Sequence, residues 1–177
     1  MKNKKLRVID FFCGAGGFSE GFRQQGFDIV QGIDNWQPAI DTHNLNHGLN
    51  DSPKDVLDFW SEDSNDVEEI EKLEDTEFLI GSPSCVSFSM SNRAGKADKT
   101  LGINLIEAYL RVIAVKKHKK NPVLKGWYME NVPKSRDFIR TEYTFEQLNL
   151  AEWAEKNGYN KNDIALKIQG EILNAGD

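Results

Sequence analysis

Cys85 and Glu130 are the residues of this chain best suited to chemistry, and each follows an apolar segment. Cys85 lies in the Ser- and Pro-containing turn 81–89, and Glu130 begins a Glu-Asn-Val segment directly after Gly-Trp-Tyr-Met. A thiolate beside a carboxylic acid is suited to attacking an electron-poor ring while a ring nitrogen is protonated. Most free cysteines are small buried hydrophobes, but Cys85 lies in a polar turn. A carboxylate that ends a buried strand is costly unless it is paired or protonated.

A second candidate site is the glycine-rich segment 12–18, which reads Phe-Cys-Gly-Ala-Gly-Gly-Phe. Glycines let the backbone turn sharply and approach a ligand closely. The spacing differs from the Gly-x-Gly-x-x-Gly of dinucleotide-binding folds. Asp34 ends the next apolar run and could bind the hydroxyls of a ribose. The glycine-rich segment and Asp34 together predict a nucleoside ligand without a pyrophosphate. A glycine-rich turn is about as often merely a tight connection that binds no ligand.

Apolar strands that alternate with helices must position these residues. We expect strands at 6–12, 27–33, 77–80, 125–129 and 165–173. We expect helices at 18–25, 38–46, 67–73, 101–119 and 144–157. This alternation predicts an α/β fold with a parallel sheet. Ligands bind at the carboxyl ends of strands in such sheets, and four polar residues fall there: Asp10, Asp34, Cys85 and Glu130.

Length and composition predict one domain, residues 1–177, with a real core. No apolar run is long enough to cross a bilayer, and the first residues leave no room for a signal peptide before the first strand. Cys13 and Cys85 lie in unrelated contexts, so we expect no disulfide framework. These features predict a protein of the reducing cytoplasm.

The net charge of −6 argues against a chain that binds nucleic acid over most of its surface. Much of the acidity lies in one block, 62–77, whereas the basic residues gather at 93–99 and 116–120. Such charge runs are usually solvated faces. They permit a local phosphate contact without demonstrating one.

Three motifs, in this order and spacing, closely resemble those of the cytosine-5 DNA methyltransferases: Phe-x-Gly-x-Gly-Gly, Ser/Pro-Cys-x-x-Phe-Ser and Glu-Asn-Val. The resemblance runs from residue 6 to the last residue. It implies an S-adenosylmethionine-dependent methyltransferase domain, a Rossmann-like three-layer α/β fold with a mostly parallel sheet. The implied cofactor-binding residues are Phe12, Gly14, Gly16, Gly17, Phe18, Asp34, Asn35, Asp55, Val56, Pro83 and Leu101.

Within that set, the resemblance implies that segment 12–18 wraps the methionine part and that Asp34 binds the ribose. Asn35 takes a place where the family often has an apolar residue against the adenine, and Trp36 lies one residue too late for that role. Asp55 matches the acidic residue that receives the adenine amino group, with Asp58 as a rival. Leu101 borders the same pocket.

The resemblance also implies roles for the two candidate catalytic residues. The thiolate of Cys85 adds to C6 of cytosine while Glu130 protonates or hydrogen-bonds N3. The activated C5 then takes the methyl group, and loss of the C5 proton expels the cysteine. In duplex DNA the target base must leave the stack to reach Cys85, and segment 89–96 would close over it.

Two departures from the family pattern stand out. Ser84 and Val86 occupy positions where the family has proline and glutamine, so we expect slower or differently selective catalysis. Residues 172–177 resemble the segment just before the family's Gln-x-Arg-x-Arg motif. We therefore expect a fold that is incomplete at its C-terminal end, with unpaired strand edges and no target recognition domain. A split enzyme with a second polypeptide, a truncated product and an incomplete sequence all fit, and the chain alone would be weakly active or inactive.

The leading hypothesis is thus a DNA cytosine-5 methyltransferase of restriction–modification or phage type, acting on double-stranded DNA. A transfer RNA cytosine-5 methyltransferase is an alternative within enzymes. A non-catalytic cofactor-binding or regulatory subunit is the alternative from another class. Ser84 and Val86 favour that last alternative, whereas the presence of Cys85 and Glu130 opposes it.

Overall fold

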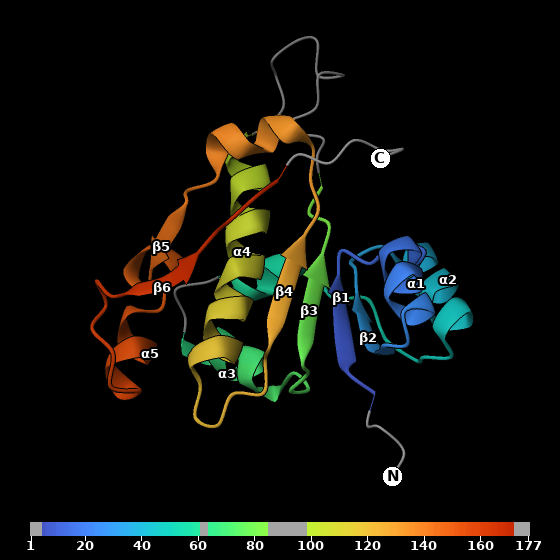
Figure 1. Ribbon diagram of the computed structural model, residues 1–177, viewed down its shortest axis with the longest axis horizontal. Coiled ribbons are helices and arrows are strands. Elements are labelled where there is room, and N and C mark those ends of the chain that lie inside the picture. Colours follow the sequence, from blue (N-terminus) through green and yellow to red (C-terminus); the bar gives the residue numbers. More distant parts are fainter. Residues whose placement is uncertain (1–4, 61–63, 85–98, 172–177) are drawn as a thin grey trace.

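A four-stranded parallel sheet organises the chain, for which a computed structural model describes residues 5–60, 64–84 and 99–171 (Figure 1). Its strands are β1 (Arg7–Phe11), β2 (Asp28–Ile33), β3 (Phe78–Gly81) and β4 (Gly126–Met129). They lie in the order β2-β1-β3-β4, and all three pairings are parallel. The carboxyl ends of the strands therefore share one edge, and the α/β prediction is confirmed.

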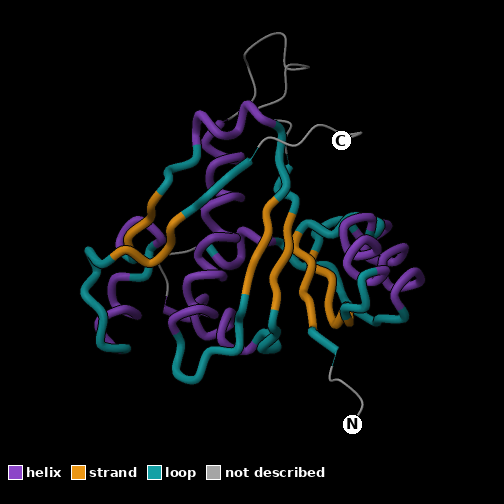
Figure 2. The backbone as a smooth tube through the Cα atoms, viewed as in Figure 1, coloured by secondary structure: helices purple, strands orange, loops and turns teal. Residues whose placement is uncertain are grey.

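Helices and short 3-10 turns connect and cover these strands (Figure 2). The α-helices are α1 (Gly17–Gln24), α2 (Gln37–His47), α3 (Ser64–Lys72), α4 (Lys99–His118) and α5 (Ala151–Lys156). The 3-10 turns are η1 (Val56–Phe59), η2 (Pro133–Phe138) and η3 (Glu146–Leu148). The first four helices lie within a few residues of their expected positions.

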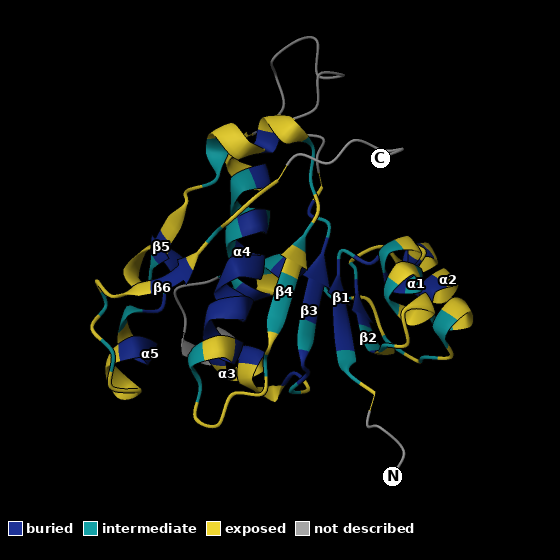
Figure 3. Cartoon of the chain, in the orientation of Figure 1, coloured by how far each residue is buried: buried dark blue, intermediate teal, exposed yellow. Residues whose placement is uncertain are grey.

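Alternation along the strands divides the core into two layers, one on each side of the sheet. Val8 and Ile80 pack on the side of Phe22 in α1. Ile9 and Leu79, their chain neighbours, join the larger cluster around α4. Successive side chains of a strand point to opposite faces, so the apolar strands can bury both faces and drive a three-layer arrangement. Figure 3 shows α4 buried along much of its length.

The single helix expected over 144–157 is wrong. Thr144 ends the strand β5 (Glu142–Thr144), and η3 and α5 follow it as separate elements. Thr144 and Gln147 exchange side-chain and backbone hydrogen bonds of 3.0 and 3.2 Å. Asn149 then adopts a left-handed conformation with φ of 53°. The first feature fixes a turn, and the second interrupts any continuous helix.

The last predicted strand also differs from expectation, because β6 (Ile164–Lys167) pairs antiparallel with β5 and stays apart from the parallel sheet. The strand is also shorter than the expected range 165–173, and its partner is β5. Tyr143 of β5 and Leu166 of β6 are each 1% exposed and belong to the cluster around α4. Burial of these two side chains against α4 explains the pairing.

The charged run 116–120 has a structural role in its first residues. Lys116 and Lys119 both bind the carboxylate of Asp75, each at 2.8 Å. Lys117 donates to the backbone oxygen of Ala165 at 3.3 Å. These lysines therefore tie α4 to the acidic segment and to β6. Among the described residues, no helix combines the length and apolar character that a membrane crossing requires.

Candidate active site at the carboxyl ends of the strands

The site lies where the sheet changes direction, between β1 and β3. From β1 the polypeptide continues to β2 at one edge of the sheet, and from β3 it continues to β4 at the opposite edge. Such a switch point leaves a crevice at the carboxyl ends, which is where ligands bind in open α/β sheets. The backbone N–H of Ser82 donates to the oxygen of Phe11 at 3.2 Å. The turn after β1 and the turn after β3 therefore leave the sheet side by side.

The glycine-rich turn after β1 has an unusual backbone. Phe12 has a φ of 56°, a left-handed conformation that is strained for a bulky residue. Gly16 has a φ of 97°, and a Cβ atom there would lie 2.5 Å from the ring Nε2 of His47. Gly17 and Phe18 follow as the first residues of α1. Both the backbone angle and the packing at position 16 therefore require glycine there.

Asp34 joins this turn to the end of β2. Its Oδ2 accepts a 3.0 Å hydrogen bond from the N–H of Gly14, and its Oδ1 accepts one of 2.9 Å from Trp36. A carboxylate has about four acceptor positions, so further positions remain for ribose hydroxyls. The predicted cofactor residues 12–18 and Asp34 are thus brought together. A backbone cradle beside a fixed carboxylate fits the nucleoside and methionine parts of S-adenosylmethionine.

The residues expected near the adenine lie next to Asp34. The side-chain amide of Asn35 donates to Asp55 Oδ2 at 3.0 Å. The other oxygen of Asp55 accepts from the N–H of Leu57 at 3.0 Å and caps η1. Val56 is 2% exposed and packs in the core, while Trp36 is 66% exposed. The structure therefore gathers Asn35 and Asp55 at this end and turns the Val56 side chain into the core.

Two hydrogen bonds join Glu130 to the end of β3 and the turn that follows it, and its neighbour Asn131 adds a third. Its carboxylate accepts from the hydroxyl of Ser82 at 2.6 Å, and its N–H donates to Gly81 at 3.0 Å. The side-chain amide of Asn131 donates to the oxygen of Pro83 at 3.0 Å. Glu130 is exposed, so the argument that it ends a buried strand at high cost does not apply. Its pairing with Ser82 holds it beside the cysteine turn instead.

The cysteine itself, Cys85, lies outside the described residues, as do Val86 and segment 89–96. The structure describes the approach to it, with Pro83 buried and Ser84 exposed. Leu101 lies in the first turn of α4, half-exposed. The other cysteine, Cys13, is buried in the glycine-rich turn, and burial strongly raises the pKa of its thiol. Cys13 is therefore a protonated packing residue there.

Sequence reasoning missed a buried polar chain beneath the glycine-rich turn. Asp10 Oδ2 accepts hydrogen bonds from the hydroxyl and the N–H of Ser19, at 2.7 and 3.2 Å. The Ser19 hydroxyl also lies 3.1 Å from Nε2 of His43. Burial raises the pKa of Asp10 to about 7 and lowers the pKa of His43 to about 4. An aspartate inside an apolar strand was the available signal, but its partners were not readable.

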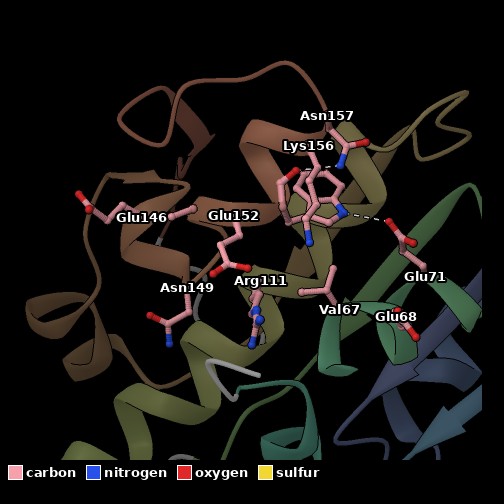
Figure 4. A pocket seen from close by; sticks show the side chains of 11 residues that line it. Val67, Glu68, Glu71, Arg111, Glu146, Asn149, Glu152, Lys156 and Asn157 are labelled. Carbon is pink, nitrogen blue, oxygen red and sulfur yellow. Dashed lines mark hydrogen bonds between the residues drawn. The ribbon is translucent and has the colours of Figure 1, made fainter. Parts of the chain in front are cut away.

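A separate cavity of about 670 Å³ opens between α3, α4, η3 and α5 (Figure 4). In it, Trp153 donates its ring N–H to Glu71 at 2.8 Å, and Asn157 donates to the backbone oxygen of Trp153 at 2.8 Å. None of its lining residues belongs to the group at the strand ends. We therefore place the candidate active site at the switch point and not in this cavity.

Comparison with known proteins finds relatives among DNA methyltransferases. M.HgiDI and M.HgiGI, type II methyltransferases from Herpetosiphon aurantiacus, are each 36% identical to this chain over 135 residues, which is 74% of it. The chain spans 38% of the length of M.HgiDI and 94% of that of M.HgiGI. A prophage-encoded E. coli protein described as a DNA modification methyltransferase has a similar fold, with a TM-score of 0.50 and 25% identity. That match covers 74% of this chain and 33% of the other.

A family model for C-5 cytosine-specific DNA methylases matches residues 6–175, which include the glycine-rich turn, the cysteine turn and Glu130. Members of this family use S-adenosylmethionine as the methyl donor. The resemblance inferred from the three motifs is thereby confirmed. The chain belongs to the C-5 cytosine-specific DNA methylase family.

Proposed function

We propose that this chain binds S-adenosylmethionine at the ends of β1 and β2 and transfers its methyl group to C5 of cytosine in double-stranded DNA. One observation carries the proposal. The turn beside Asp34 and the turn held by Glu130 leave the sheet next to each other, on the two sides of the switch point. A nucleoside cofactor and a base would then meet over the same edge.

The proposed cofactor contacts combine this geometry with the roles that the family resemblance implies. Segment 12–18 would cradle the methionine part, and the remaining lone pairs of Asp34 would accept from the ribose. Asn35 and Asp55 would lie near the adenine, with Pro83 and Leu101 at the border of the pocket. When bound, the cofactor supplies an electrophilic methyl group on a sulfonium.

The proposed chemistry of the protein's own residues balances as follows. The Cys85 sulfur forms a bond to C6 of cytosine, and N3 takes a proton or a strong hydrogen bond from Glu130. This addition breaks the C5–C6 double bond and makes C5 nucleophilic, so that C5 accepts the methyl group. A base then removes the C5 proton, N3 returns its proton to Glu130, the double bond re-forms and the thiolate leaves, while the methyl donor is released as S-adenosylhomocysteine. The 2.6 Å contact with Ser82 would orient Glu130 for its part.

The biological setting that the relatives support is a restriction–modification system, because M.HgiDI and M.HgiGI are named as type II methyltransferases. For this chain that setting is part of the proposal. We also propose that residues 1–177 form one catalytic domain.

Covalent trapping tests the proposal. Duplex DNA containing 5-fluorocytosine has no C5 proton to lose, so the Cys85 adduct should persist after methyl transfer. We expect a cofactor-dependent, denaturation-resistant complex with the wild-type protein and none with Cys85→Ala. A complex formed equally well by Cys85→Ala would contradict the assignment.

Two further arms refine this experiment. Transfer RNA containing 5-fluorocytosine replaces the DNA in one arm, and efficient trapping there alone would favour the RNA alternative. In the other arm the purified chain is tested by itself. Trapping in that arm would show that the second polypeptide of the split-enzyme alternative is not required.

A further inference from the structure

Asp10, Ser19 and His43 form a buried hydrogen-bonded chain that joins three elements. Asp10 belongs to β1, Ser19 to the first turn of α1, and His43 to the middle of α2. All three residues are fully buried. The distances are 2.7 Å from Ser19 Oγ to Asp10 Oδ2 and 3.1 Å from Ser19 Oγ to His43 Nε2.

The direction of the protons follows from the chemistry of the hydroxyl. Ser19 has one hydroxyl proton and donates it to Asp10, so its oxygen must accept from His43. His43 is therefore protonated on Nε2, which leaves a bare lone pair on Nδ1. Within the described part of the chain, that Nδ1 and the second carboxylate oxygen of Asp10 have no hydrogen-bond partner. The unpartnered Asp10 oxygen is the place where a proton on this carboxyl group would lie.

His43, at one end of these hydrogen bonds, packs directly against the proposed cofactor site. A Cβ atom at Gly32, in β2, would lie 2.5 Å from the His43 ring, and one at Gly16 would lie 3.0 Å from it. The His43 ring also packs on the ring of His47, with centroids 4.6 Å apart. We call the hydrogen-bonded chain of Asp10, Ser19 and His43 the relay. It links the start of α1 to the residues that pack beneath the glycine-rich turn. No residue of the relay needs to touch the ligand for it to fix the turn.

We propose that the Asp10–Ser19–His43 relay positions the glycine-rich turn for the nucleoside ligand, with Ser19 and His43 as positioning residues. This inference rests on the proposed function, because it concerns the same cofactor site. Charge-assisted hydrogen bonds are stronger than neutral ones. The two hydrogen bonds from Ser19 are therefore strongest when Asp10 is ionised, although burial of that charge costs stability of the fold as a whole. Ligand affinity should follow the ionisation of Asp10.

The groups that face the relay set this titration. Burial raises the pKa of Asp10 to about 7, the two hydrogen bonds from Ser19 oppose that rise, and the charge of Asp34 adds to it. The other titratable groups that act on the relay are Cys13 and His47, together with Tyr109 from α4. Removing the Ser19 hydroxyl should raise the pKa of Asp10 further, because it removes a bond to the charged form.

Calorimetric titration of the full chain with S-adenosylhomocysteine tests the relay. We expect Ser19→Ala to weaken binding about tenfold, as for loss of a buried hydrogen bond to a charged group. His43→Leu should have a similar effect, whereas His43→Gln, which keeps a donor near the Nε2 position, should retain most of the affinity. Thr76→Val is the matched control. It removes a buried hydroxyl that donates to Phe78 at the start of β3, and it should leave affinity unchanged.

The pH profile provides a readout that a purely structural role would not move. Wild-type affinity should rise with pH through about 7. The midpoint should move to higher pH in Ser19→Ala, and the profile should flatten in Asp10→Asn. Equal affinities for wild type, Ser19→Ala and His43→Leu, or an unchanged midpoint in Ser19→Ala, would overturn the positioning role alone. Absence of wild-type binding would overturn the proposed function, and the relay's role with it.

Discussion

At the scale of single residues, Ser82 decides how Glu130 is held. The carboxylate is exposed, so it has many accessible orientations in water, and the 2.6 Å contact selects one beside the cysteine turn. Asn131 fixes the same turn through Pro83. The proposed acid is therefore positioned by its neighbours across the strands more than by burial.

Ser82→Ala should reduce cytosine methylation about tenfold, because the carboxylate loses a charge-assisted hydrogen bond that orients it. Cofactor affinity should stay unchanged, since the hydrogen bond of the Ser82 side chain goes to Glu130. Steady-state methylation and S-adenosylhomocysteine titration separate the two effects. Thr42→Ala, which removes an exposed hydroxyl on α2, serves as the control. A parallel fall in affinity would argue against a role confined to Glu130.

Substitutions of two glycines in the glycine-rich turn distinguish the cost of backbone strain from the cost of a steric contact. A Cβ atom at Gly14 meets nothing within 4 Å, so Gly14→Ala should cost only the strain of its φ of 52°, about 1 kcal/mol of unfolding free energy. Gly16→Ala adds a contact with His47, so we expect a cost of about 3 kcal/mol. Urea unfolding of both variants measures this difference. Equal costs would show that the His47 ring moves aside freely.

The sequence located Asp34 and Glu130 correctly because strand ends can be read from apolar runs. It could not identify Ser82 or His43 as partners. Ser82 meets Glu130 only through the pairing of β3 with β4, which are far apart in the chain. His43 meets Ser19 only because α1 and α2 pack on the same side of the sheet. Hydrogen-bond partners of this kind depend on register and packing, which local patterns do not specify.

At the scale of elements, the parallel strands and the first four helices follow from periodicity, whereas β5, η3 and α5 do not. The apolar run of β3 is short and continuous, and that of β1 is interrupted only by Asp10, as is typical of buried parallel strands. Segment 144–157 instead contains good helix formers whose local preference is overruled. Tyr143 gains burial as a strand residue, and the hydrogen bonds between Thr144 and Gln147 fix the turn that follows. Tertiary burial outweighs helix propensity there.

The β5–β6 pair should contribute to stability through its buried side only. Leu166→Ala removes a side chain that is 1% exposed and should lower the free energy of unfolding by about 2–4 kcal/mol. Ile164→Ala, two residues earlier and 44% exposed, should cost about 1 kcal/mol or less. Thermal or urea unfolding of both proteins tests this asymmetry. Similar losses at the two sites would mean that β6 is not anchored on α4.

At the scale of the whole molecule, Asp10 and His43 make opposite contributions to the pH dependence of stability. The pKa of Asp10 is raised from 3.8 to about 7, so its stabilising contribution is present below 3.8 and is lost as the pH rises through 7. The pKa of His43 is lowered from 6.5 to about 4, so its contribution is present above 6.5 and is lost as the pH falls toward 4. The two contributions oppose each other between pH 4 and 6.5.

His43→Gln removes one of these opposing contributions. Relative to wild type, the unfolding free energy of His43→Gln should therefore improve steadily on acidification from pH 6.5 to 4.5. Asp10→Asn should show the reverse trend against wild type. Urea unfolding at several pH values gives both differences. Parallel pH curves for all three proteins would mean that neither group titrates with a perturbed pKa in the fold.

The parallel arrangement of the central strands also has a kinetic consequence. Val8 pairs with Ile29, and only a short stretch of sequence that contains α1 separates the two residues. Val8 also pairs with Phe78, which lies much farther along the sequence. Contacts between distant segments require closure of long loops and slow the search for the native state. We therefore expect the β1–α1–β2 unit to assemble before β3 and β4 dock. In stopped-flow refolding, Ile29→Val should slow folding, while Leu79→Ala should mainly accelerate unfolding.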